Sequence, residues 1–76
     1  MEVDTKINMI AIPPVMSQAQ FAAFVGKDEK TIRSWVITRA VPTIKMGGSR
    51  LINLEKFRTD LAAGKDEFVK GDYDDV

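Results

Sequence analysis

Apolar residues recur along this chain in short stretches with helical spacing. In the first stretch, Phe21, Phe24 and Val25 stand at positions i, i+3 and i+4. Ser17, with a glutamine three residues later, matches a capping box, and Gly26 is the residue type that commonly ends a helix. The pattern predicts a two-turn helix between Ser17 and Gly26.

A second stretch follows after only a few residues. Ile32, Trp35 and Val36 repeat the same spacing, Asp28 is a favourable N-cap, and Pro42 is expected to stop the helix. Two short helices joined by a tight glycine-containing turn are typical of a helix-turn-helix.

The pattern then changes from helical to extended. Residues 43–46 form an extended run, Gly47 and Gly48 are a hairpin-turn dipeptide, and residues 50–52 are expected to return as the partner strand. Both glycines are expected to supply positive φ angles for the turn.

A third helix is predicted after this hairpin. Asn53 is its N-cap, Leu54, Phe57 and Leu61 stand at i, i+3 and i+7, and Gly64 closes it. Helical spacing also assigns the aromatic side chains to the core rather than to a base-stacking surface: Phe21, Phe24, Trp35 and Phe57.

The two flanks differ from this middle part. Pro13 and Pro14 forbid a helix in residues 1–16 and allow at most an edge strand up to Ile12. Residues 65–76 are acidic and poor in core-forming side chains, so we expect a flexible tail. The predicted organisation is an N-terminal extended segment (1–16), a domain (17–64) and the tail (65–76). The predicted fold class is α+β, a small winged helix-turn-helix with three helices and a two-stranded β-hairpin wing, to which the N-terminal segment can add a strand.

Composition excludes several classes of site. The chain has no cysteine and no histidine, which excludes disulfides and thiolate metal sites. Many of its acids lie in the predicted tail, where a preorganised catalytic site cannot be built. We therefore expect no enzyme activity, no catalytic residue, no metal and no cofactor. No stretch is long and apolar enough to cross a bilayer, and the start lacks the basic and apolar segments of a signal peptide, so we expect an intracellular protein without membrane contact.

Charge is unevenly distributed, although the formal net charge is zero. Residues 27–50 carry six basic side chains against two acidic ones, a balance of +4. Residues 51–76 carry four basic and seven acidic side chains, a balance of −3, and the first 26 residues carry −1. A basic middle segment of this kind indicates a polyanionic partner.

The second helix and the hairpin place this positive charge on elements that duplex DNA accommodates. A short helix with a polar face fits the major groove, its N-terminus favours a phosphate, and a narrow ribbon tip follows the backbone or the minor groove. The candidate DNA-binding residues are Lys27, Lys30, Thr31, Arg33, Ser34, Arg39, Lys45, Gly48, Ser49 and Arg50.

These motifs resemble a known family. The pattern of phage excisionases and MerR-like winged-helix proteins is similar to four stretches of this chain: residues 26–35 (GKDEKTIRSW), 41–42 (VP), 47–50 (GGSR) and 54–57 (LEKF). Within that pattern the chain looks most like the Cox proteins of temperate bacteriophages, through Ile12-Pro13, Gly26-Lys27 and residues 42–46 (PTIKM). The resemblance covers about residues 10 to 61.

The resemblance implies two linked activities. Cox-like proteins repress a lysogeny promoter and act as recombination directionality factors that help the phage integrase to excise the prophage. They bind repeated sites, bend DNA and associate side by side, and the strand exchange belongs to integrase. The implied location is the bacterial host cytoplasm, in association with the nucleoid.

Self-association suggests a role for the tail. Its charge and aromatics could contact a neighbouring protomer, through Asp66, Glu67, Phe68, Val69, Asp72 and Tyr73. Two alternatives stay open from the sequence. One is a dimeric transcriptional regulator of the same fold that binds a single palindrome. The other is a protein-interaction or DNA-packaging adaptor module.

Overall fold

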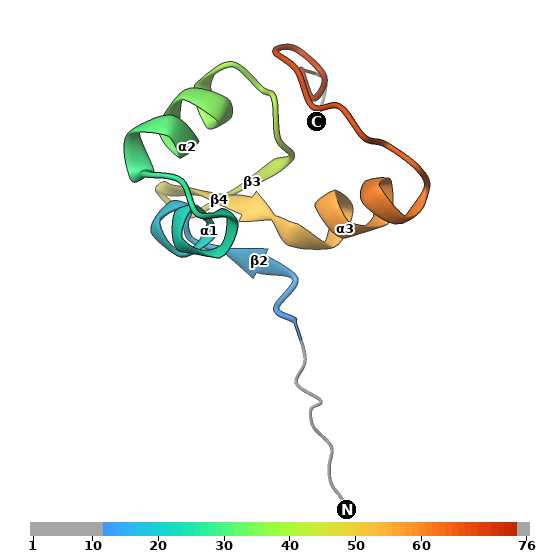
Figure 1. Cartoon of the computed structure of the whole chain (residues 1–76). Helices are drawn as coiled ribbons and strands as arrows, with labels where there is room; N and C mark the ends of the chain where they lie inside the picture. The colour runs from blue at the N-terminus through green and yellow to red at the C-terminus, as the bar shows by residue number, and fades with distance from the viewer. Residues whose placement is uncertain (1–11, 75–76) are drawn as a thin grey trace, which may run out of the picture.

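A computed structural model describes residues 12–74 of the chain. The described part contains three helices and a three-stranded antiparallel sheet, so the α+β class is confirmed. With the labels of Figure 1, the order along the chain is β2 (Val15–Met16), α1 (Gln18–Val25), α2 (Glu29–Ile37), β3 (Thr43–Met46), β4 (Ser49–Asn53) and α3 (Leu54–Ala62).

Helix α1 begins at the predicted capping box. The Ser17 hydroxyl accepts a hydrogen bond from the Gln20 backbone N–H at 3.0 Å, and the Gln20 side chain accepts one from the Ser17 N–H at 3.1 Å. The helix ends with Gly26 in the left-handed region, at φ 76°. Both boundary residues are those that the sequence predicted.

Helix α2 ends earlier than expected. Pro42 does not stop it, because the last helical residue is Ile37. Arg39 turns into the left-handed region at φ 61°, and the Ala40 N–H then donates to the carbonyl of Trp35 at 2.9 Å. This is the hydrogen bond of a Schellman motif, built here with an arginine where glycine is usual.

The sheet has the strand order β2-β4-β3, with β4 in the centre. We expected a two-stranded hairpin to which the N-terminal segment can add a strand; the added strand is Val15 and Met16, which pair with Asn53 and Ile52 of β4. This strand follows the two prolines, where backbone N–H groups are again present to pair. The edge strand predicted up to Ile12 lies outside the described residues except for Ile12 itself, which is not in a strand.

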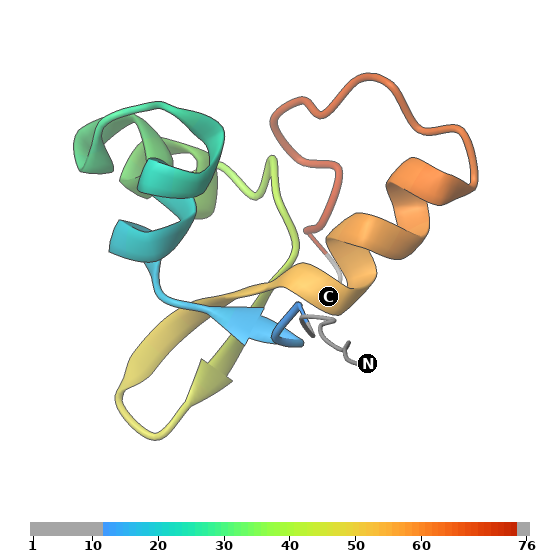
Figure 2. The same ribbon diagram turned by 60° about the horizontal axis from the view of Figure 1, so that its bottom comes forward.

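The core lies between the two helix groups and the sheet. Figure 2 shows α1 and α2 on one side, α3 on the other and the strands between and below them. Phe21, Ile32, Ile52 and Leu54 are completely buried. Phe24 is a correction to the predicted core, because its side chain is 58% exposed and stacks on Phe21 only at the rim.

The C-terminal segment differs most from its prediction. We expected a flexible tail, but residues 65–74 return across α3 to the end of α2 (Figure 2). The Gly71 N–H donates to the carbonyl of Thr38 at 2.8 Å, and the Tyr73 N–H donates to that of Arg39 at 3.0 Å. Only 4% of Tyr73 is exposed.

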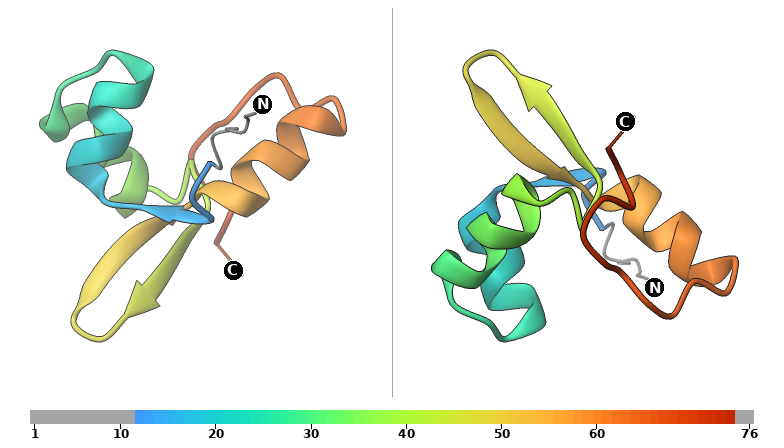
Figure 3. Two further views of the ribbon diagram at one scale, coloured as in Figure 1. Left: turned by 90° about the horizontal axis from the view of Figure 1, so that it is seen from below. Right: turned by 90° about the horizontal axis from the view of Figure 1, so that it is seen from above.

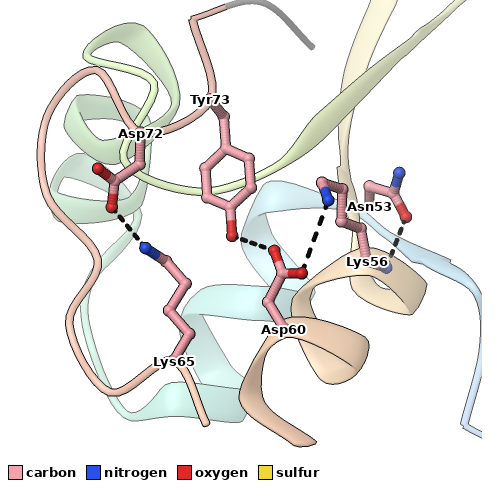
Figure 4. Close-up of polar contacts among 6 residues, drawn as sticks. All are labelled: Asn53, Lys56, Asp60, Lys65, Asp72 and Tyr73. Carbon is pink, nitrogen blue, oxygen red and sulfur yellow. Dashed lines mark hydrogen bonds and ion pairs between the residues drawn. The ribbon is translucent and has the colours of Figure 1, made fainter. Parts of the chain in front are cut away.

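Side chains fix the same segment to α3. In Figure 4 the Tyr73 hydroxyl donates to Asp60 of α3, whereas the ion pair of Lys65 with Asp72 at 2.7 Å lies within the segment itself. Phe68 lies between Phe57 and Tyr73, with ring centroids 5.1 and 6.3 Å away. The acidic composition predicted solvation, but the two aromatic side chains bury enough apolar surface to order the segment.

None of the helices in residues 12–74 combines the length and the apolar character that crossing a bilayer requires.

Candidate nucleic-acid interface

Helix α2 presents a polar face to solvent. Ile32 and Val36 are buried against the core, whereas Lys30, Arg33 and Ser34 are exposed. Their spacing of three and four residues places these three side chains on one face of the helix. The structure therefore gathers three of the predicted residues into one exposed patch.

The N-terminus of α2 is less open to phosphate than predicted. The Asp28 carboxylate accepts the Thr31 backbone N–H at 2.9 Å, and Glu29 follows in the first turn. Hydrogen bonding from Thr31 lowers the pKa of Asp28, so the carboxylate is firmly anionic at neutral pH. Thr31 is half-buried and Lys27 is exposed just before the helix. An anion from the chain itself already occupies this helix end.

The β3–β4 pair brings two cations together. Lys45 stands directly opposite Arg50 in the register, so both side chains lie on the same face of the sheet. Like charges in directly opposed positions destabilise a strand pair. Lys45 is exposed, and so are Gly48 and Ser49 at the turn.

Arg50 is held back from the turn. One of its guanidinium nitrogens, Nη1, donates to the Thr43 hydroxyl at 2.9 Å, and its carbonyl accepts from the Gln18 side chain at 3.0 Å. Arg50 is accordingly half-buried. Part of its hydrogen-bonding capacity is used inside the protein, and Lys45 is the more accessible cation of the pair.

The turn between these strands needs one left-handed residue rather than two. Gly47 has a φ of 62°, whereas Gly48 is not in the positive-φ region. The prediction that both glycines supply positive φ is therefore wrong for Gly48.

Arg39 lies apart from the polar face of α2. It is half-buried where α2 ends, and its carbonyl is bound by the N–H of Tyr73. Its backbone conformation and its place under the C-terminal segment give it a structural part that the sequence did not indicate.

The elements that carry these residues lie on one side of the molecule. Both views of Figure 3 place α1, α2 and the turn of the β3–β4 pair away from α3. Within residues 12–74 the ion pairs are Lys56–Asp60 at 3.6 Å and Lys65–Asp72 at 2.7 Å, both made by α3 and the C-terminal segment. No acid in that part of the chain forms a salt bridge with a cation of α2 or of the β3–β4 pair. The same residues hold no cluster of three or more acids able to bind a metal ion.

An apolar cavity separates α1 and α2 from α3. Its volume is about 220 Å³, and its lining comes from both helix groups, the segment after α2 and the C-terminal segment. The lining residues are Phe21, Val25, Trp35, Ala40, Val41, Phe57 and Phe68. Trp35 is half-buried and packs against the core, on the side of the helix that its spacing predicted.

The chain is similar to a known phage protein. The "10.1 kDa protein" of Pseudomonas phage Pf1 is 42% identical over 72 residues, which cover 91% of this chain and 80% of the relative. The chain belongs to the family of this Pf1 protein. The name of this relative states its mass, and its source is a bacteriophage. No protein-family model and no solved structure matches the chain.

Sequence reasoning missed the contacts of the C-terminal segment with α2 and α3. A signal was present, because Phe68, Val69 and Tyr73 stand among acids, whereas disordered tails are poor in aromatic residues. The left-handed Arg39 carries no such signal, since an arginine gives no indication of positive φ.

Proposed function

We propose that this protein binds duplex DNA as a winged helix-turn-helix, with α2 in the major groove and the β3–β4 pair as the wing. The observation that carries the proposal is the exposed patch of Lys30, Arg33 and Ser34 on α2. Lys45 and Arg50 stand opposite each other in the β3–β4 pair, and Figure 3 places α2 and the turn of that pair away from α3. Groove-reading helices and ribbon wings both present cations to the backbone in this way.

In the cell, this DNA binding serves phage regulation. We propose that the protein represses a lysogeny promoter and acts as an excision directionality factor alongside integrase, without chemistry of its own. The phage origin of its Pf1 relative supports this setting. One protomer contacts few phosphates, so useful affinity comes from cooperative neighbours on repeated sites, in a bacterial host cytoplasm.

The structure reduces the set of tail residues that can contact a neighbouring protomer. Tyr73 is buried and Phe68 is half-buried in the protomer itself. The tail residues that remain exposed for a neighbour are Asp66, Glu67, Val69 and Asp72.

A salt titration of DNA binding tests the central proposal. If about four cations neutralise phosphates, the slope of log K against log salt is near −3.6 per protomer. Replacing Arg33 or Lys45 by alanine removes one contact and reduces the slope by about 0.9. Arg58→Ala is the matched control, because Arg58 is exposed on α3, away from the proposed interface. A flat salt dependence, or an Arg58→Ala variant that weakens binding as much as Arg33→Ala, contradicts the proposal.

Fragment length tests the excision role. Ladder-like cooperative complexes on a long fragment with repeated sites, together with stimulated excision by integrase in vitro, are the expected results. A single discrete complex that protects one palindrome indicates a simple dimeric repressor.

A further inference from the structure

The polar face of α2 ends in an exposed isoleucine. Ile37 is the last residue of the helix and is 71% exposed. This is the highest value among the exposed large hydrophobic side chains of residues 12–74; the others are Ile12, Phe24, Ile44, Met46, Leu61 and Val69.

Ile37 continues the stripe of the proposed reading residues. It follows Arg33 by four positions and Lys30 by seven, which is the spacing of side chains on one helix face. The capping residue that follows, Thr38, turns its hydroxyl back to the Ser34 carbonyl at 2.8 Å. The isoleucine therefore stands at the C-terminal end of a stripe whose other members are polar or positively charged.

The major groove offers one kind of apolar group to such a side chain. Of the four bases, only thymine presents a methyl group there, at C5, while the other groups that distinguish the base pairs in this groove are hydrogen-bond donors or acceptors. Positive charge at Lys30 and Arg33 fits the phosphates that border the groove. Four residues of helix advance about 6 Å, and stacked base pairs are about 3.4 Å apart.

We propose that Ile37 contacts the C5 methyl group of a thymine, one or two base pairs along the groove from the phosphate that Arg33 contacts. The inference rests on the proposed DNA-binding function and makes Ile37 a specificity residue of the same interface. The site bound by this protein then contains a thymine whose methyl group, rather than its hydrogen-bonding atoms, is read at that position.

Uracil substitution isolates the methyl group. A high-affinity duplex is first selected from a random pool with the full chain, and each thymine is then replaced singly by uracil. Binding of the wild-type protein is expected to fall about fourfold at one thymine, the equivalent of losing one buried methyl group. At the same position, 5-methylcytosine is expected to bind more tightly than cytosine, because it restores the methyl group alone.

Variants assign that effect to Ile37. Ile37→Ala is expected to bind the uracil and thymine duplexes equally at that position, and Ile37→Val to keep an intermediate preference. Because the side chain is exposed, neither change opens a core cavity, and equal thermal unfolding midpoints verify this. Leu61→Ala is the matched control, an exposed apolar residue at the far end of α3, and should keep the full preference.

The outcomes separate the two proposals. Duplex binding without any uracil-sensitive position, or the same sensitivity in Ile37→Ala as in wild type, overturns the thymine contact and leaves the DNA-binding proposal intact. Absence of salt-dependent duplex binding overturns the proposed function, and the thymine contact with it.

Discussion

Tyr73 anchors the C-terminal segment to the rest of the protein. Its ring is buried, its hydroxyl donates to Asp60, and its backbone N–H binds the carbonyl of Arg39. Tyr73 thus links the residues after α2, through its backbone, to α3, through its side chain. It is also the only tyrosine of the chain, so its ionisation can be measured without interference.

The titration of Tyr73 gives the first prediction. Burial, and then the hydrogen bond and negative charge of Asp60, raise the pKa of Tyr73 well above its usual value near 10. The stability that comes from Tyr73 is present below pH 10 and is lost as the pH rises further, because the unfolded chain ionises first. Absorbance at 295 nm should show ionisation only together with alkaline unfolding. A reversible titration near pH 10 in the folded protein would be inconsistent with the buried hydroxyl.

Replacement of Tyr73 by phenylalanine provides the control for that titration. The variant keeps the ring and loses the hydrogen bond to Asp60, so the free energy of unfolding at pH 7 should fall by about 1 to 2 kcal/mol. Between pH 10 and pH 12 its stability should decline less steeply than that of the wild type.

Arg39 supports a second prediction at this scale. An L-residue in the left-handed region costs about 1 to 2 kcal/mol, and glycine avoids most of this at some cost in flexibility. Arg39→Gly should therefore raise the free energy of unfolding by about 0.5 to 1 kcal/mol. Arg39→Ala, which removes the same charge and keeps the Cβ, should give no such gain. Denaturant unfolding of the two variants makes the comparison.

The sequence predicted those side-chain hydrogen bonds that join residues only a few positions apart. Ser17, Asp28 and Asn53 are the predicted N-caps, and each accepts the expected backbone N–H. The bond from Arg50 to Thr43 joins two strands, and the carbonyl of Arg39 is bound by Tyr73 of the distant C-terminal segment. Neither is encoded in a short stretch of sequence.

At the scale of elements, periodicity located all three helices and the β3–β4 pair. It did not locate β2, because two residues are too short to show an alternation. It also overestimated the buried stripes of α1 and α3: Phe24 and Leu61 are 58% and 46% exposed. Spacing shows which residues share a helix face. How much of that face is buried depends on where the neighbouring helix lies.

Removing the C-terminal segment tests its part in the fold. Deletion of residues 65–76 uncovers Phe57 and leaves the Thr38 and Arg39 carbonyls without their partners. Loss of the buried Tyr73 and half-buried Phe68 side chains should cost about 3 kcal/mol or more. Fluorescence of Trp35, the single tryptophan, should shift to the red. Asp66→Ala and Glu67→Ala, which change exposed charges of the same segment, should leave the unfolding midpoint unchanged.

For the whole molecule, the feature that bears on stability is the apolar cavity between the two helix groups. Val25 lines it at the end of α1. Val25→Leu adds one methylene toward the empty volume and should raise the free energy of unfolding by about 0.5 to 1 kcal/mol. Ala23→Leu places a larger side chain on the exposed side of the same helix and should give no comparable gain. A loss of stability in Val25→Leu would show that the cavity cannot accept the added group.

The opposition of Lys45 and Arg50 has a consequence for the protein in the absence of DNA. Repulsion between two cations in one cross-strand pair works against the ladder that holds them, and dissolved ions screen it. Backbone amides of β3 and β4 should therefore exchange hydrogen more slowly as ionic strength rises. A strand pair stabilised by opposite charges would show the reverse dependence. Added salt, which weakens binding to a polyanion, would thus make the β3–β4 pair more rigid.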